Sequence, residues 1–90
     1  MSVKPFVKDP NEVLDYGINW IKLIGSDTIL TSSWIVPDGI TKVSDTFEKS
    51  ISIVWISGGN LDTTYTLEGR INTIAGRTFV RHINIKISEK

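Results

Sequence analysis

The sequence predicts a single all-β domain built as a sandwich. β-Branched residues dominate its composition, since 14 Ile, 7 Val and 9 Thr fill a third of the 90 residues. Such side chains favour the pleated, half-buried surface of a sheet, whereas alanine, the best helix former, occurs once, at Ala75. Several segments alternate apolar and polar residues with period two and end at turn residues. Because short strands of this kind need a second sheet to bury their apolar faces, we expect two stacked sheets.

The first part of the chain predicts an arm and two strands. Residues 1–11 contain two prolines and no periodicity, so we expect an extended arm there, followed by one sandwich domain over residues 12–90. Alternation then predicts strands over residues 12–20 and 28–36. Their expected inward residues are Leu14, Tyr16, Ile18 and Trp20 in the first strand, and Leu30, Ser32, Trp34 and Val36 in the second.

Two further strands are expected in the middle of the chain. Residues 40–47 form the weaker one, with Val43 and Phe47 as expected core contacts. The other strand, residues 51–56, is apolar on both faces. One face consists of Ile51, Ile53 and Trp55, and we take it as the inward face. The other face consists of Val54 and Ile56, and we expect it to be covered as well.

The last third carries the strongest pattern, a hairpin over Tyr65–Ser88. Two alternating runs flank the short loop Ala75–Arg77, which contains a glycine. Arg81 breaks the inward series, which predicts either a bulge or a position at the sheet rim. The other expected inward residues are Tyr65, Leu67, Gly69, Ile71, Phe79, Ile83, Ile85 and Ile87. The chain as a whole therefore predicts six to seven antiparallel strands.

The start of this hairpin also indicates the kind of sandwich. A leucine in the preceding connection, Leu61, followed by a tyrosine that opens the penultimate strand, Tyr65, resembles the tyrosine corner of immunoglobulin and fibronectin-III domains. Trp34 is the expected anchor between the two sheets. We therefore expect an immunoglobulin/fibronectin-III-like β-sandwich.

Charge is unevenly distributed in a chain of zero formal net charge. Residues 9–68 hold nine acids and three bases, whereas residues 69–90 hold five bases and one acid. Five bases spread along a hairpin are too few to predict nucleic-acid binding. The outward residues Arg70, His82 and Lys86 are the candidate docking face.

No catalytic, cofactor or metal site is expected. The chain has no cysteine and one histidine, His82, in an outward register, whereas acid–base catalysis needs positioned histidines or paired carboxylates. The acidic groups Asp9/Glu12/Asp15 and Asp45/Glu48 do not match a calcium loop. The turn 57–60 is glycine-rich but lacks the lysine and helix of a phosphate loop. Neither a secretory signal nor an apolar run long enough to cross a membrane is visible, so no membrane partner is expected.

Ordered motifs across most of residues 8–87 resemble the phage fiber–tail adaptor family, a group of small virion structural proteins of tailed phages and prophages. The matching segments are Lys8–Trp20, Gly25–Ile29, Ser33–Pro37, Val54–Gly59, Tyr65–Leu67, Arg70–Thr73 and Ala75–Thr78. The sequence departs from the family at Ile21–Ile24, where family members are often more polar and carry a second tryptophan. The end of the first strand is therefore expected to pack differently.

The resemblance implies a non-enzymatic virion protein with an immunoglobulin-like fold that docks between tail or baseplate and fiber subunits. It further implies synthesis in the bacterial host cytoplasm and an oligomeric arrangement in the particle. The alternative function is an immunoglobulin-like carbohydrate-binding or adhesion module that uses an exposed tryptophan. All three tryptophans fall in the expected inward registers, which favours core packing, and Trp20, near a strand end, is the candidate for an exposed ring in this alternative.

Overall fold

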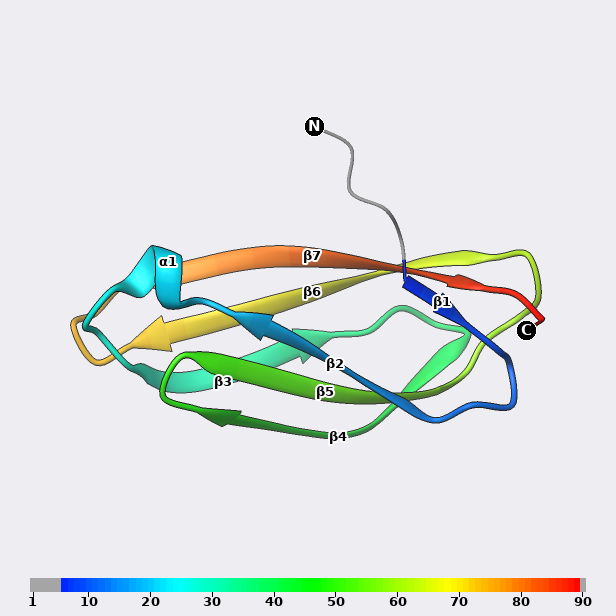
Figure 1. Ribbon diagram of the computed structural model, residues 1–90, viewed down its shortest axis with the longest axis horizontal. Helices are drawn as coiled ribbons and strands as arrows, with labels where there is room; N and C mark the ends of the chain where they lie inside the picture. Colours follow the sequence, from blue (N-terminus) through cyan, green and yellow to red (C-terminus); the bar gives the residue numbers. More distant parts are fainter. Residues whose placement is uncertain (1–5, 90) are drawn as a thin grey trace.

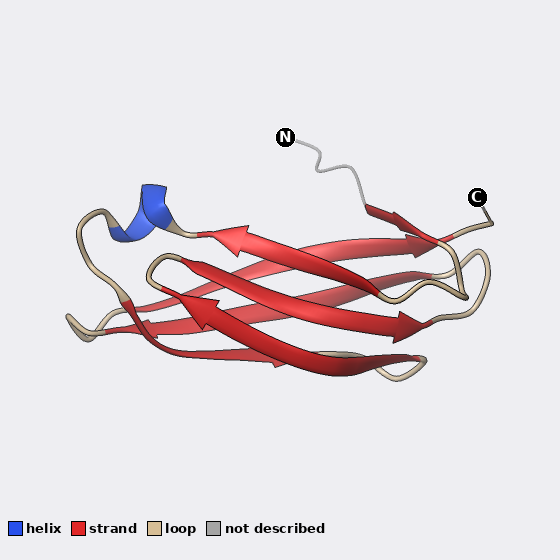
Figure 2. Cartoon of the chain, turned by 60° about the horizontal axis from the view of Figure 1, so that its bottom comes forward, coloured by secondary structure: helices blue, strands red, loops and turns tan. Residues whose placement is uncertain are grey.

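Within residues 6–89, seven strands form two sheets that stack face to face, and one short helix connects two of these strands (Figure 1). The structure is a computed structural model, and it describes residues 6–89. The short helix α1 lies at the end of the sandwich away from the C-terminus (Figures 1 and 2). The elements are β1 (Phe6–Lys8), β2 (Leu14–Asn19), α1 (Ile21–Ile24), β3 (Ile29–Ile35), β4 (Ile40–Glu48), β5 (Ile51–Gly58), β6 (Thr64–Thr73) and β7 (Thr78–Ile87).

The order of the strands is β1-β7-β6-β3 in one sheet and β2-β5-β4 in the other. Lettered A to G along the chain, these sheets read A-G-F-C and B-E-D, whereas an immunoglobulin constant-type domain has A-B-E-D and C-F-G. The two arrangements differ in the first strand, which here pairs in parallel with β7, while all other pairings are antiparallel. The predicted all-β sandwich is confirmed.

Strand β1 falls within the segment expected to be an arm. Its last residue, Lys8, is fully buried and bridges the two sheets, because its ammonium donates hydrogen bonds to the carbonyl oxygens of Asp9 (3.0 Å) and of Gly58 at the end of β5 (2.6 Å). Residues 1–5 of the expected arm lie outside the described residues. The boundary between arm and domain at residue 12 stays a prediction.

The hairpin of β6 and β7 follows the predicted alternation closely. Its nine pairs run without a register shift from Thr64 opposite Lys86 to Asn72 opposite Thr78. The side chains predicted to face inward on both strands are buried, apart from Phe79, which is half-buried, and Arg81, which is exposed. Arg81 lies opposite Gly69 in an uninterrupted ladder, and β1 covers only residues 85–87 of β7. Arg81 is therefore at the sheet rim and not at a bulge.

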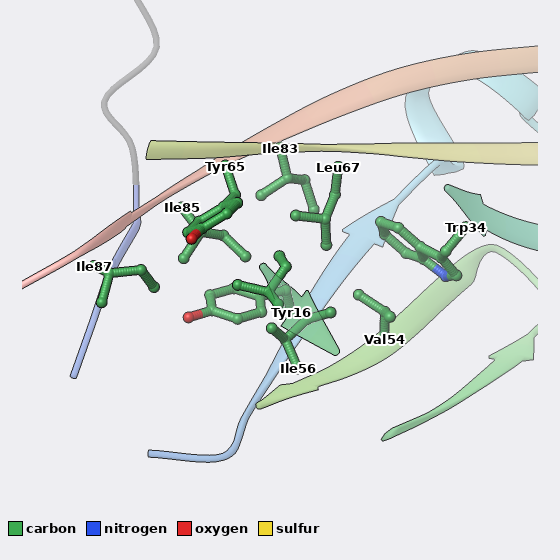
Figure 3. Packing of buried hydrophobic residues seen from close by; sticks show 10 residues of the cluster. Tyr16, Trp34, Val54, Ile56, Tyr65, Leu67, Ile83, Ile85 and Ile87 are labelled. Atoms are coloured by element: carbon green, nitrogen blue, oxygen red, sulfur yellow. The ribbon is translucent and has the colours of Figure 1, made fainter. Parts of the chain in front are cut away.

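The core forms where this hairpin packs on β2 and β5. Figure 3 shows Tyr65, Leu67 and Ile85 of one sheet pointing toward Tyr16 and Ile56 of the other. Trp34 is buried in the same cluster, which confirms it as an anchor between the sheets. Gly69 leaves room for it, since a Cβ atom there would lie 3.0 Å from Trp34 Cζ3. Burial raises the pKa of Tyr16, and the nearby acids Glu12 and Asp15 raise it further.

A second cluster lies at the α1 end and contains Trp20. The inward position predicted for Trp20 is confirmed, because the side chain is 1% exposed and packs with Ile24, Ile29 and Ile71, and Trp20 is therefore not the exposed ring that the alternative function would use. Its indole Nε1 donates a hydrogen bond of 3.0 Å to Ser52 Oγ, so the polar atom that burial removes from water has a partner. The segment Ile21–Ile24, where the chain departs from the family pattern, forms α1 and brings Ile24 into this cluster.

Strand β5 has the opposite orientation to the predicted one. Ser52, Val54 and Ile56 face the core, whereas Ile51 and Trp55 are exposed and Ile53 is half-buried. Alternation could not choose between two apolar faces, and only one side of this sheet is covered by the other sheet. The observed orientation of β5 agrees with that of the neighbouring strand β2, since Val54 lies opposite the buried Tyr16.

Two bulges account for the other misplaced side chains. A register shift between Ile29 and Thr31 turns Ile29 into the core and leaves Leu30 exposed. A second shift, between Lys42 and Ser44, leaves Val43 exposed on β4. Phe47 is exposed as well, because β4 is the edge strand of its sheet. The predicted core roles of Leu30, Val43 and Phe47 are therefore wrong.

The hydrogen bond of the predicted tyrosine corner is present, whereas its leucine contact is not. Tyr65 is buried near the start of β6, and its Oη accepts a hydrogen bond of 3.1 Å from the backbone N–H of Asn60. Its ring packs on Gly39, where a Cβ atom would lie 2.7 Å from Tyr65 Oη. Leu61 is exposed and takes no part in the buried corner. Tyr65 thus holds the β5–β6 connection beside the turn between β3 and β4.

Replacing Tyr65 with phenylalanine is expected to lower the free energy of unfolding by about 1 to 2 kcal/mol, because the N–H of Asn60 loses its acceptor while the ring stays in place. Urea denaturation measures this change. Tyr16→Phe is the matched control, since the buried Tyr16 Oη has no hydrogen-bond partner among the described residues and its removal should cost little. Equal destabilisation by the two variants would contradict the role of the corner.

Asp27 is expected to make stability depend on acid pH. The Thr73 side chain, then the N–H groups of Thr28 and Ala75 and the charge of Arg77, lower the pKa of Asp27 against a smaller effect of burial. Its contribution to stability is therefore complete above the ordinary carboxyl pKa of about 4 and is lost as the pH falls through the lowered native pKa.

Asp27→Asn should consequently lose less stability than the wild type between about pH 4 and pH 2. Urea denaturation at several pH values measures the slope. The control is Asp38→Asn, in the exposed turn after β3. The assignment to Asp27 fails if both variants change the slope equally.

Candidate docking surfaces

The outward residues of β6 and β7 form a surface that we call the hairpin face. All three candidate docking residues lie on it, as their register predicts, with Arg70 on β6 and His82 and Lys86 on β7. The side chains of Arg70 and His82 are 50% and 59% exposed. The structure therefore places the three residues on one side of one sheet, and their docking role stays a prediction.

Glu68 places a negative charge between two of the bases on this face. Its Oε2 lies 3.3 Å from Arg70 Nη2, and its Oε1 lies 3.4 Å from His82 Nε2. The acid sits between the two bases because it lies directly opposite His82 and two residues before Arg70 on its own strand. Exposed contacts of this kind add little stability.

Lys86 stands apart from this charge cluster. It lies four residues beyond His82 on β7, which corresponds to about 13 Å along the strand. It makes no ion pair with any residue in the range 6–89. The three bases of the candidate docking face therefore divide into a cluster around Glu68 and a separate cation, Lys86.

Hydrogen bonds between strands order the polar side chains of the hairpin face. Thr66 Oγ1 donates to Asn84 Oδ1 at 2.8 Å, and Thr78 Oγ1 donates to Asn72 Oδ1 at 2.7 Å. Asn72 in turn donates to Thr31 Oγ1 on β3 at 2.9 Å. Side chains that are already fixed lose less conformational entropy when a partner binds.

A second surface, which sequence reasoning missed, lies on the outer side of the other sheet. Ile51, Ile53 and Trp55 of β5 project from it, and we call this set the apolar ridge. Trp55 and Ile51 are 39% and 41% exposed. The ridge lies between the outward residues of β2 and those of β4, which are Asp15, Gly17 and Asn19, and Ser44, Thr46 and Glu48. The sequence feature that could have revealed this ridge is that both faces of residues 51–56 are apolar.

A groove of about 300 Å³ adjoins one end of the ridge. It is lined by Thr46, Phe47, Glu48, Ile51 and Ile53, where β4 turns into β5. Small-molecule sites are usually apolar clefts of this size or larger with several convergent polar groups. Here the polar lining consists of one threonine and one glutamate, so the groove fits an apolar side chain of a protein partner better than a polar ligand.

The ridge is flanked by acids. Asp15 lies beside Trp55 on β2, and Glu48 lies beside Ile51 on β4. The outward positions paired with β5 hold these two acids and no base. The two outer surfaces of the sandwich therefore differ in sign, since cations predominate on the hairpin face and carboxylates flank the ridge.

The remaining sequence candidates have local structural roles. Glu12 Oε1 accepts a hydrogen bond from the backbone N–H of Asp9 at 2.9 Å, and Asp45 pairs with Lys42 at 3.0 Å. Within residues 6–89, no three His, Cys, Asp or Glu residues are grouped so as to hold a metal ion. No helix in that range is long and apolar enough to cross a membrane.

Comparison with known proteins places this structure in a family. A family model described as podophage GP4 fiber-tail adaptor protein gp77 matches residues 8–86. A search of curated proteins finds no match. The matched range extends from the end of β1 almost to the end of β7, and so includes every strand of both sheets in whole or part. The chain belongs to the podophage fiber-tail adaptor family.

Proposed function

We propose that this chain is a non-enzymatic structural subunit of a phage virion that connects tail or baseplate subunits to fiber subunits by protein docking. Membership of the fiber-tail adaptor family carries this proposal. In the same proposal, the protein is made in the cytoplasm of the bacterial host and acts in the assembled particle.

The arrangement of surfaces supports an adaptor. A connecting subunit needs two separate docking surfaces on a body that does not deform. The hairpin face and the apolar ridge are the outer sides of two different sheets, and the sandwich measures 41 × 30 × 19 Å (Figure 2). The two surfaces therefore point in opposite directions and can contact two neighbours at once.

The position of the histidine supports a non-enzymatic role. His82 lies beside Glu68 on an open sheet surface and outside the groove at Phe47. General acid–base catalysis needs such a group positioned against a bound substrate. The carbohydrate-binding alternative uses an exposed tryptophan; Trp20, the candidate for that role, is buried, whereas Trp55 is 39% exposed.

Reversing charge on the hairpin face is expected to reduce incorporation of the subunit into particles. Arg70→Glu combined with Lys86→Glu replaces the two permanent cations of the face, and we expect about tenfold less protein per particle, equivalent to about 1.4 kcal/mol of docking free energy. Mass spectrometry of purified virions measures the copy number.

The matched control combines Lys22→Glu with Arg81→Glu. It changes the net charge by the same amount, but Lys22 lies on α1 and Arg81 lies at the rim, in the inward register. Equal incorporation of the two double variants would contradict docking through the hairpin face. Absence of the wild-type chain from purified particles would overturn the proposed function itself.

A further inference from the structure

Strand β4 has a free edge. It pairs with β5 on one side, and no strand within residues 6–89 pairs with its other side. A bulge between Lys42 and Ser44, together with the ion pair of Lys42 and Asp45, interrupts the first part of this edge. Residues 44–48 pair regularly with β5 beyond the bulge. Alternate residues of such a segment direct their backbone N–H and C=O groups away from the paired strand, so this part of the edge can accept another strand.

The inner side of this segment leaves an apolar position open. Phe47 lies opposite Ser52, which is buried, so the register of Phe47 is inward. Its side chain is nevertheless 40% exposed, because β4 is the last strand of its sheet. A strand added to residues 44–48 would bring an inward side chain beside this ring. An apolar side chain in that place would remove the exposed part of Phe47 from water, which favours binding.

The outer side of the same segment borders the groove of about 300 Å³. Thr46 and Glu48 lie opposite Ile53 and Ile51, and all four line the groove. Because threonine is short, a long side chain of an added strand can pass over it into the groove. Glu48 makes no ion pair with any residue in the described part of the chain. A lysine or an arginine fits both features, since its stem is apolar and its cationic head can meet Glu48.

The other free edges among residues 6–89 lack this combination. On β2 and β3 the inward aromatic residues Tyr16 and Trp34 are already buried, so an added strand would find no open aromatic ring there. Strand β7 is free only before residue 85, and this part carries the exposed Arg81 in an inward register. An inward charge of this kind discourages strand pairing. Strand β1 has three residues and offers too short an edge.

We propose that residues 44–48 of β4 bind an extended segment of a different virion subunit, which adds to the sheet as a further strand. The segment alternates basic residues on its outer side with apolar residues on its inner side. Backbone hydrogen bonds to β4 supply affinity, while Phe47, Glu48 and the groove select the side chains. This inference rests on the proposed docking function and deepens it, since it names the strand that docks and the chemistry of the partner.

Charge disfavours a second copy of the chain as the occupant of this edge. Residues 44–48 hold two acids, Asp45 and Glu48, and no base. If two copies paired along this segment, Glu48 of each copy would gain no opposite charge from the segment of the other. A basic segment of another subunit supplies that charge, which is why we assign the site to a different chain.

Titration of the isotope-labelled full chain, followed by NMR, tests the proposal with a defined probe. The probe is a short peptide that is blocked at both ends and alternates valine and lysine. We expect it to shift the backbone amide resonances of residues 44–48 and to bind with a Kd at or below about 1 mM. A peptide that alternates valine and glutamate should bind at least about tenfold more weakly, because Glu48 repels it.

N-Methylation of the probe separates strand addition from simple charge attraction. Alternate residues of a strand direct their N–H groups to opposite sides, so methylating all valines or all lysines blocks one side only. We expect one of the two methylated peptides to lose binding and the other to keep it, because one side of the peptide pairs with β4 and the other does not.

Variants of the full chain locate the site. Glu48→Lys and Phe47→Ser should each weaken binding of the unmethylated valine–lysine peptide by at least about tenfold. The matched controls are Asp15→Lys on β2 and Val43→Ser at the bulge of β4. They make the same kinds of change at exposed positions outside residues 44–48, and we expect them to bind the peptide like the wild type.

Cross-linking in purified virions identifies the natural occupant. Photoreactive benzoylphenylalanine in place of Phe47 keeps an aromatic ring at this position and reacts with the chain that covers it. We expect mass spectrometry to find the cross-link in a different virion protein, within a segment that alternates basic and apolar residues.

Three results would overturn the proposal. They are amide resonances of residues 44–48 that do not shift with up to about 1 mM valine–lysine peptide, equal binding by the two methylated peptides, and a virion cross-link that is absent or joins two copies of this chain. Any of these results, with the wild-type chain still present in purified virions, would leave the proposed adaptor function standing.

Discussion

The structure depends on how strand β5 divides its two apolar faces. In a two-layer sandwich each sheet has one covered side, so β5 can bury one set of side chains against β6 and β7 and must leave the other outside. Ser52, Val54 and Ile56 form the buried set. A slip of one residue would exchange the two sets. The hydrogen bond from Trp20 Nε1 to Ser52 Oγ opposes this slip, because the slip would move Ser52 to the outer face and leave the buried indole without its acceptor.

Other connections hold the sheets in this relation. Lys8 joins β1 to the end of β5, and Tyr65 holds the β5–β6 connection through Asn60. A chain of 90 residues buries a limited fraction of its surface and has no disulfide to compensate. Docking a partner on exposed apolar surface would stabilise the folded form further, since a partner that binds only this form favours it by mass action. The apolar ridge thus leaves apolar surface exposed to water in the isolated domain, and a partner that covers this surface would stabilise the folded form.

The sequence predicted those elements in which one face is apolar and the other polar. The hairpin from Tyr65 and the first strand around Tyr16 have this pattern, and both were placed with their correct inward sides. Strand β5 was misplaced because period two holds no preference between two apolar faces. The bulges near Leu30 and Val43 shift the register by amounts that only pairing with a neighbouring strand defines.

The same distinction explains the candidate surfaces. The outward side of Arg70, His82 and Lys86 followed from alternation, whereas the contact of Glu68 with His82 depends on the register between strands. The apolar ridge was missed because a tryptophan in a strand was assigned to the core. Ser52, a small polar residue within the buried set, shows that side-chain polarity alone does not identify the inward face.

The central claim is that the outer side of β5 is covered when the protein is assembled. Hydroxyl-radical footprinting of the isolated chain and of purified virions, read by mass spectrometry at the three tryptophans, tests it directly. Trp20 and Trp34 are buried in the monomer and serve as internal references. The account predicts that Trp55 is oxidised readily in the dilute isolated chain and is protected in virions to the level of Trp20 and Trp34. Equal oxidation of Trp55 in both samples would contradict it.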